Sequence, residues 1–242
     1  MGNGINKVLP DLYLGNFRDA RDREQLARHN ITHILSIHDS AAPILQEGRT
    51  GATNLHNNLV CSSTNKSPLC VHHQKRTLGL LLISGPLTGN WWYFVPQEMT
   101  YLCISAADLP SQNLTQHFKQ SITFMHESRL KGEGCLVHCL AGVSRSVTLV
   151  LAYIMTVTRL GWQEALAAVR VVRPCAGPNL GFQRQLQEFE ATQADQFREW
   201  LQKEYKDNSF SDEADLRDLL AAASKVNGDW VEKQESTPPG DL

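Results

Sequence analysis

The stretch GCLVHCLAGVSRS, residues 134–146, decides the fold of this chain. Residues 134–138 are largely apolar and indicate a buried strand, and an apolar pattern with helical spacing runs from Arg145 to Thr158. Residues 139–144 are therefore expected to form a short loop between a buried strand and a helix. The backbone amides of such a loop converge with the helix N-terminus on one point, where they bind an anion.

Two side chains of this segment carry reactive groups. Arg145 stands at the start of the helix, and its guanidinium is a two-pronged donor that fits the oxygens of a phosphate. Cys139 opens the loop, where the same positive field lowers the pKa of its thiol and favours the thiolate. A nucleophile and an anion-binding loop in one segment predict cleavage of phosphate esters through a thiophosphate intermediate.

The neighbours of Cys139 have expected roles as well. We expect the His138 ring to orient the loop backbone and tune the thiolate, and not to act as a base. The Ser146 hydroxyl stabilises the thiolate when it departs, and Gly142 allows a tight turn. The residues expected to bind phosphate are Leu140, Ala141, Gly142, Val143, Ser144 and Arg145. A buried cysteine before an ordinary helix N-terminus would explain Cys139 and Arg145 alone. It would not explain why His138, Gly142 and Ser146 also stand at the matching positions.

Outward from this segment, strands alternate with helices, which predicts an α/β layered domain. Strands are predicted at 8–9, 12–14, 31–37, 101–104 and 134–138, and helices at 19–30, 114–125, 145–158, 162–172 and 182–205. An irregular insertion, without a sustained period, is predicted at about 46–99. The domain is expected to span 1–207, and 208–242 to hold a helix and a tail that is disordered after Asn227.

Composition excludes several classes of function. The 242 residues have a net charge of −2 and no block of Lys or Arg, so a nucleic-acid partner is not expected. The longest apolar run, residues 78–83, is far below the roughly 20 residues of a membrane span. Residues 1–10 lack the apolar core of a secretory signal. Six cysteines are too few for a disulfide scaffold and suit a reducing cytosol.

Residues 138–146 resemble the signature His-Cys-x5-Arg-Ser/Thr of the protein tyrosine phosphatase superfamily, in its dual-specificity branch. The resemblance covers about 1–45 and 100–207, and its further motifs lie at 1–4, 12–16, 32–36, 106–108 and 178–182. It implies the cysteine-based phosphatase fold, a central mixed sheet flanked by helices, here with a long inserted loop.

The resemblance also implies a general acid about thirty residues before the cysteine. Asp108 stands 31 residues before Cys139, directly after the predicted strand, and would protonate the leaving group and then deprotonate the attacking water. A turn cap before Pro110 is the plainer interpretation of Asp108. Asn113 and Asn179 resemble family positions that brace two loops through hydrogen bonds: the acid loop, which contains Asp108, and the phosphate loop, residues 139–144. A simple turn or helix cap is equally compatible with each asparagine.

The substrates implied by the resemblance are phosphotyrosine and phosphoserine or phosphothreonine in signalling proteins, within kinase signalling of the JNK/MAP kinase type. Lysines, which relatives acting on inositol lipids tend to carry in the loop, are missing from 139–145. Metal and other cofactors are not expected, because the arginine and the amides neutralise the phosphate. Cys61, Cys70, His72 and His73 lie close in sequence but match no familiar zinc pattern.

Gly2 is the acceptor position for N-myristoylation, although Asn6 stands where the motif usually has Ser or Thr. The resemblance favours acylation, so we expect a cytoplasmic protein that associates reversibly with the inner face of the plasma membrane.

Two alternatives to a phosphatase, and one hypothesis about its regulation, remain at this point. A rhodanese-like sulfurtransferase also uses a loop cysteine, but Asp108 and Ser146 would then lack a role. A phosphoprotein-binding module made inactive by the insertion would bind phosphopeptides without releasing phosphate. Oxidation could also regulate an enzyme of this kind, with Cys103 or Cys135 as the partner of Cys139 in a disulfide.

Overall fold

The structure is a computed structural model that describes residues 4–42, 69–74, 80–81, 93–94, 99–206 and 210–235, with the backbone alone for 69–94 and 225–235. The strands are β1 (Asn6–Leu9), β2 (Leu12–Gly15), β3 (Ile31–His38), β4 (Leu69–Gln74), β5 (Leu80–Leu81), β6 (Tyr93–Phe94), β7 (Met99–Ser105) and β8 (Gly134–His138). The helices are η1 (Asp19–Arg21), α1 (Arg23–Arg28), η3 (Thr115–His117), α2 (Phe118–Leu130), α3 (Arg145–Val157), α4 (Trp162–Val172), α5 (Leu180–Thr192), α6 (Ala194–Glu204) and α7 (Asp212–Glu235).

The central sheet has six strands in the order β1-β2-β8-β3-β7-β4. β8 pairs in parallel with β2 on one side and with β3 on the other, and β7 continues the parallel part beyond β3. The two edge strands, β1 and β4, are antiparallel to their neighbours. The predicted mixed sheet flanked by helices is confirmed, and the carboxyl ends of β3, β7 and β8 meet at one edge of it.

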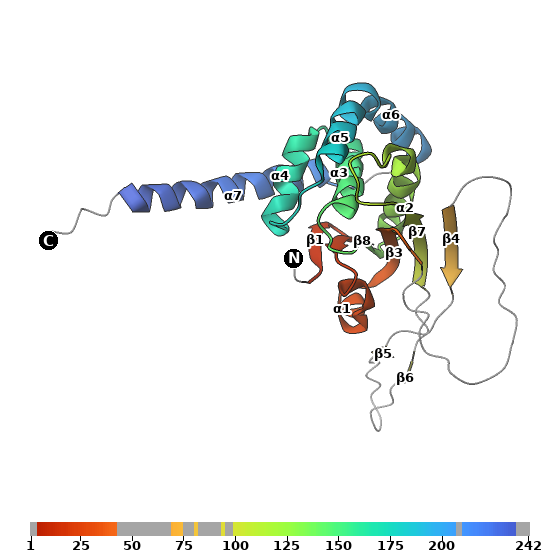
Figure 1. The fold of residues 1–242 in the computed structure, drawn as a ribbon. Coiled ribbons are helices and arrows are strands. Elements are labelled where there is room, and N and C mark those ends of the chain that lie inside the picture. The colour runs from red at the N-terminus through yellow and green to blue at the C-terminus, as the bar shows by residue number, and fades with distance from the viewer. Residues whose placement is uncertain are drawn as a thin grey trace, which may run out of the picture.

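The central strands of the sheet are covered on both faces, which explains why apolar residues of β3 and β8 face both sides. All eight residues of β3 are buried. On β8, Val137 faces the larger core with α2 to α7, whereas Leu136 faces a smaller core with Leu26 of α1. Figure 1 shows α2 to α6 on one side of the sheet and α1 on the other.

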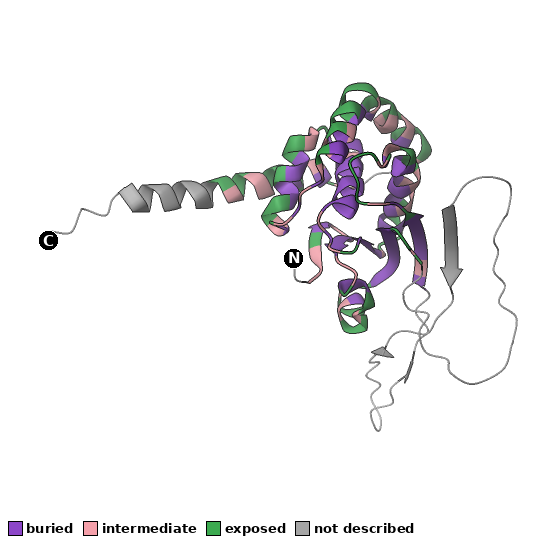
Figure 2. Cartoon of the chain, viewed as in Figure 1, coloured by how far each residue is buried: buried purple, intermediate pink, exposed green. Residues whose placement is uncertain are grey.

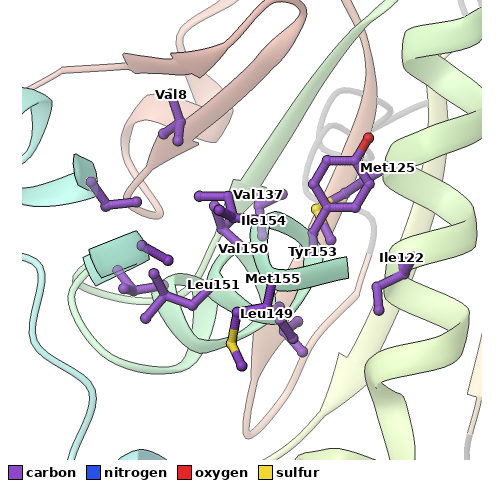
Figure 3. Packing of buried hydrophobic residues seen from close by; sticks show 14 of the residues in the cluster. Val8, Ile122, Met125, Val137, Leu149, Val150, Leu151, Tyr153, Ile154 and Met155 are labelled. Atoms are coloured by element: carbon purple, nitrogen blue, oxygen red, sulfur yellow. The ribbon is translucent and has the colours of Figure 1, made fainter. Parts of the chain in front are cut away.

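Helix α3 is the centre of the larger core. Its residues from Arg145 to Thr156 are all buried, and it contacts α2, α4, α5 and α6 as well as β8 (Figure 2). Figure 3 shows Val150 and Ile154 of this helix beside Val137 of β8. Burying each such side chain stabilises the fold by roughly 1.5–3 kcal/mol, so the start of α3 is firmly placed at the end of β8.

The helix predicted over 182–205 is wrong in one respect, because the chain breaks at Gln193 into α5 and α6. The turn lets Phe197 of α6 pack edge-on against Phe189 of α5, with ring centroids 5.0 Å apart. Tertiary packing of aromatic rings therefore overrides a helical pattern that is continuous in the sequence.

The predicted irregular insertion contains regular structure in the part that the structure describes. β4 pairs with β7 from Leu69 opposite Ile104 to Gln74 opposite Met99, so that it supplies partners to the backbone groups of β7. β5 and β6 pair with one another. The remaining residues of 46–98, including Trp91 and Trp92, lie outside the described residues.

The disorder predicted after Asn227 is also wrong for part of the tail. Helix α7 continues to Glu235, and its last four residues, 232–235, are good helix formers. The prolines at 238 and 239 lie outside the described residues. Within the part of the chain that the structure describes, no helix is long and apolar enough to cross a membrane.

A buried ion pair ties α7 to the domain. The Arg129 guanidinium donates to both carboxylate oxygens of Asp212, at 2.7 and 2.8 Å, and neither side chain is more than 2 % exposed. Arg129 also donates to the Tyr153 hydroxyl and to the Pro10 carbonyl, each at 2.7 Å, and its guanidinium lies over the Phe210 ring.

Replacing Asp212 by alanine leaves a buried guanidinium without its carboxylate. We expect a loss of about 3–5 kcal/mol in the free energy of unfolding, measured by urea denaturation. The exposed Asp215 on the same helix is the matched control, and Asp215→Ala should change stability by no more than about 0.5 kcal/mol. Wild-type stability in Asp212→Ala would contradict this account of how α7 is held.

Candidate active site

Residues 139–144 leave the end of β8 and enter α3, as the sequence predicts, and Cys139 at the start of this loop is only 1 % exposed. Gly142 has φ +66°, the left-handed region that favours glycine. A Cβ at this position would also run into the carbonyl oxygen of Gly15 and the Arg173 side chain. The loop can therefore turn this sharply only with glycine at 142.

The loop carbonyls are bonded on the outside of the loop. The Leu140 oxygen accepts from the Phe17 amide at 3.2 Å, and the Val143 oxygen accepts from the Gly177 amide at 2.9 Å. The Gly142 oxygen accepts from Arg173 Nε at 2.6 Å. A trans peptide unit is planar with its C=O and N–H antiparallel, so each of these bonds turns the following amide toward the inside.

The Cys139 sulfur lies on the inside of the loop. The Gly142 amide donates to Sγ at 3.1 Å, and the Ser146 hydroxyl donates to it at 3.3 Å. Burial raises the pKa of the Cys139 thiol, but hydrogen bonds from the Ser146 hydroxyl and from the amides of Ser146, Val143 and Gly142 together lower it below its usual value. The site therefore favours a thiolate, as the sequence predicts.

His138 lies behind the loop. Its ring is completely buried, and Nδ1 is 3.3 Å from the Cys139 carbonyl oxygen, which can only accept. Burial lowers the pKa of His138 to about 4, although the bond to Cys139 acts in the opposite direction. The neutral ring therefore carries its proton on Nδ1 and orients the start of the loop.

Arg145 is held from one side. Its Nη1 donates to the Ala106 carbonyl at 2.9 Å and to Asp39 Oδ2 at 3.3 Å, and the residue is only 4 % exposed. Its Nε has no hydrogen-bond partner among the described residues. Asp108 Oδ2 lies 3.6 Å from Nε, close enough for an ion pair but too far for a hydrogen bond. This orientation leaves Nε available for a phosphate oxygen.

Asp108 lies against the phosphate loop. Its Oδ1 accepts from the Ser144 hydroxyl at 2.7 Å and from Asn179 Nδ2 at 2.9 Å. The backbone amide of Asn179 also donates to the Ser144 hydroxyl, at 3.2 Å. The structure thus brings the predicted general acid beside the nucleophile loop. Asn179 fulfils both of its interpretations, because it links the two loops and also caps α5, where its Oδ1 accepts from the Phe182 amide at 3.0 Å.

Asn113 behaves differently. Its side-chain oxygen accepts from the amide and hydroxyl of Thr115, at 2.9 and 2.7 Å, and so stabilises a local turn before η3. The plainer of its two interpretations is the correct one.

Comparison with known proteins agrees with this geometry. The sequence profile of the family "Dual specificity phosphatase, catalytic domain" matches residues 82–192. The chain is 62 % identical over 224 residues to dual specificity protein phosphatase 22-B of Danio rerio, covering 93 % of this chain and 94 % of that protein. It is 50 % identical over 222 residues to dual specificity protein phosphatase 22 of Homo sapiens, covering 92 % and 93 %.

The chain belongs to the dual specificity phosphatase family. The crystal structure of DUSP15 has a TM-score of 0.60 and 40 % identity to it, and covers 84 % of this chain and 98 % of that one. Family membership makes the chain a protein-tyrosine/serine/threonine phosphatase by class and shows the sulfurtransferase alternative to be wrong.

Two residues of this phosphatase site were not predicted from the sequence. Asp39 follows β3 directly, at the edge where the parallel strands end, and that position was a usable signal. Arg173 is a lone charge between Val172 and Pro174 at the end of α4, and it is 1 % exposed. A buried arginine of this kind requires acceptors, but the sequence does not show where they are.

The disulfide predicted between Cys139 and either Cys103 or Cys135 does not fit the structure. Cys135 lies four residues earlier on the extended β8, about 13 Å along the strand. Cys103 is in register with Ser36 of β3, which is itself opposite His138, so it lies two strands and about 10 Å from the end of β8. Both separations exceed the roughly 7 Å between Cα atoms that a disulfide permits.

Two groups of predicted residues cannot be placed. Gly2 and Cys61 lie outside the described residues, and the side chains of Cys70, His72 and His73 are not described either. Within the described ranges, no group of three or more His, Cys, Asp or Glu side chains could hold a metal ion.

Replacing Ser146 by alanine should raise the pKa of Cys139. A hydrogen bond to a charged group contributes about 1.5–3 kcal/mol, which corresponds to an increase of about 1–2 pKa units. The thiolate fraction at a given pH then falls, so the pH profile of the alkylation rate with iodoacetamide moves to higher pH.

The matched control is Ser121→Ala, because Ser121 is also buried and its hydroxyl has no partner among the described residues. An unchanged alkylation profile in Ser146→Ala would show that the hydroxyl does not stabilise the thiolate.

Proposed function

We propose that this chain hydrolyses phosphotyrosine and phosphoserine or phosphothreonine in proteins through a cysteinyl-phosphate intermediate. The observation that carries the proposal is the environment of the Cys139 sulfur, which accepts hydrogen bonds from the Gly142 amide and the Ser146 hydroxyl. Arg145 and Asp108 lie at the same loop. A nucleophile, an anion-binding ring and an acid therefore share one site.

In the first step, the thiolate of Cys139 attacks phosphorus, an S–P bond forms and the bond to the leaving oxygen breaks. Asp108, in its protonated form, gives its proton to that oxygen. The negative charge of the transferring group is stabilised by the inward amides and by Arg145, whose donors are already in place before the substrate arrives.

In the second step, Asp108 is a carboxylate and takes a proton from water. The water oxygen attacks phosphorus and the S–P bond breaks, which releases inorganic phosphate. The sulfur leaves as a thiolate, which the Ser146 hydroxyl and the Gly142 amide stabilise by the same bonds that lower its pKa.

The rim of the site supports a phosphoprotein as the substrate. Leu109, Leu140 and Leu180 are 56 %, 50 % and 68 % exposed, and each directly follows a residue of the site. Exposed leucines next to the phosphate loop suit contact with the apolar parts of a phosphorylated side chain and its peptide. Family membership supports a role in kinase signalling of the JNK/MAP kinase type.

Strand β4 of the inserted segment lies away from the phosphate loop. β4 is separated from β8 by β7 and β3, which places its backbone about 14 Å away from that of β8. This position favours an active enzyme over a binding module that the insertion has inactivated.

Localisation and acylation are a further part of the proposal. Gly2 follows Met1 and is the acceptor position for myristate. A single acyl chain gives only reversible membrane binding, so we propose a cytoplasmic enzyme with a fraction on the inner face of the plasma membrane.

The test of the catalytic proposal is phosphate release from phosphotyrosyl and phosphothreonyl peptides. We expect turnover of both without added metal, none in Cys139→Ser, and a loss of about 10²–10⁴-fold in Asp108→Asn because proton transfer is removed. Cys175→Ser, at a partly exposed cysteine outside the loop, is the matched control and should keep wild-type turnover. Turnover in Cys139→Ser would refute the mechanism, and tight peptide binding without phosphate release would support the inactive module.

The test of acylation is co-expression with an N-myristoyltransferase followed by mass spectrometry of the intact chain. We expect a myristoyl adduct in the wild type and none in Gly2→Ala, with the acylated chain binding phosphatidylserine-containing vesicles with a constant of about 10⁴ M⁻¹. A wild-type chain that stays unmodified would rule out this part of the proposal.

A further inference from the structure

The geometry points to a positioning role for Arg173 and Asn6, which makes the N-terminal segment part of the support of the phosphate loop. The inference rests on the proposed function, because it concerns how the reactive state of Cys139 is maintained. Arg173 ends α4 and Asn6 begins β1, so the two residues come from distant parts of the chain.

Arg173 connects the loop with the N-terminal segment directly. Its Nε donates to the Gly142 carbonyl at 2.6 Å, and its Nη1 donates to Asn6 Oδ1 at 2.6 Å and to the Gly4 carbonyl at 3.3 Å. The guanidinium is buried, so these acceptors replace the water that it has lost.

The Gly142 carbonyl is the critical contact of this group. Because the peptide unit is planar and trans, an oxygen held toward Arg173 turns the Val143 amide toward Cys139. The Val143 amide is one of the donors that lower the pKa of Cys139. Glycine at 142 has little barrier to rotation, so an unheld unit could flip its oxygen toward the sulfur and repel both the thiolate and the phosphate.

The N-terminal segment in turn holds Arg173 in place. The bond from Arg173 Nη1 to Asn6 Oδ1 is its shorter bond to this segment, whereas Arg173 Nη2 has no hydrogen-bond partner among the described residues. Asp19 lies in the same buried group. Its burial raises the pKa of its carboxyl, and this effect outweighs the Asn16 amide, the Arg173 charge and the Gly4 amide, which act to lower the pKa. Loss of Asn6 would therefore leave Nη1 with only its longer bond to the Gly4 carbonyl, at 3.3 Å, and would loosen the hold of Arg173 on Gly142.

A consequence concerns the start of the chain. Gly4 is held against Arg173, and the proposed acyl acceptor Gly2 stands only two residues before it. Along the chain, a group attached at Gly2 is therefore no more than about 7 Å from Gly4, which contacts the arginine that supports the phosphate loop.

The test uses the full chain and three substitutions: Asn6→Ala, Asn6→Asp and, as a matched control, Lys7→Ala. Lys7 is the exposed neighbour of Asn6 on β1. The measurements are kcat and KM for an aryl phosphate, the pH profile of Cys139 alkylation by iodoacetamide, the Val143 amide shift in ¹H–¹⁵N NMR, and Tm.

We expect Asn6→Ala to lower kcat by about tenfold, the effect of losing one hydrogen bond to a charged group, and to move the alkylation midpoint up by about one pH unit. The Val143 amide shift should move as well. Asn6→Asp keeps an acceptor for Arg173 and should restore kcat to within about twofold of the wild type, and Lys7→Ala should match the wild type.

If Asn6→Ala lowers only Tm, while kcat, the alkylation midpoint and the Val143 shift match those of Lys7→Ala, the segment is merely structural and the inference is overturned. Should Asn6→Ala fail to fold, Arg173→Lys is the second test. A lysine has a single donor nitrogen in place of the fork by which Nε holds Gly142 and Nη1 holds Asn6, so this variant should lower kcat more than its change in Tm predicts. Failure of the proposed function is a separate result, because it is read from turnover in Cys139→Ser.

Discussion

The direction of the peptide planes in residues 139–144 is the constraint on which this site depends. Each loop carbonyl that is bonded on the outside turns the next amide toward the inside of the loop, because the peptide unit is planar. The Gly142 carbonyl is held by Arg173, and its neighbours by backbone amides of two other segments. The buried Cys139 can be a thiolate only because these inward donors outweigh the cost of its burial.

The same loop also sets the position of the general acid. Ser144 donates to Asp108 and accepts from the Asn179 amide, so the acid loop, the phosphate loop and the start of α5 share one hydroxyl. The proton donor and the nucleophile are thus positioned by a hydrogen-bond network within the protein. Such preorganisation is what makes a metal ion unnecessary for the chemistry proposed for this family member.

Secondary structure was predictable where the local pattern and the tertiary packing agree. The strands β3 and β8 and the helix α3 are buried along almost their whole length and are mostly apolar, so their sequences permit few alternatives. The break at Gln193 was not predictable, because it depends on a ring contact between α5 and α6. β4 was missed for a related reason: its pairing with β7 joins segments that carry no joint signal in the sequence.

The sequence by itself determined the chemistry of this protein, because Cys139, Gly142, Arg145 and Ser146 lie within one short segment, a loop and the first residues of a helix, whose conformation follows from the strand before it and the helix itself. It also indicated Asp108 through the family resemblance. The tertiary structure alone decided which residues hold that loop in its reactive form. Arg173, Asn6 and Asp39 reach it from remote segments, and the hydrogen bonds that they make depend on distances in space that spacing along the chain does not encode.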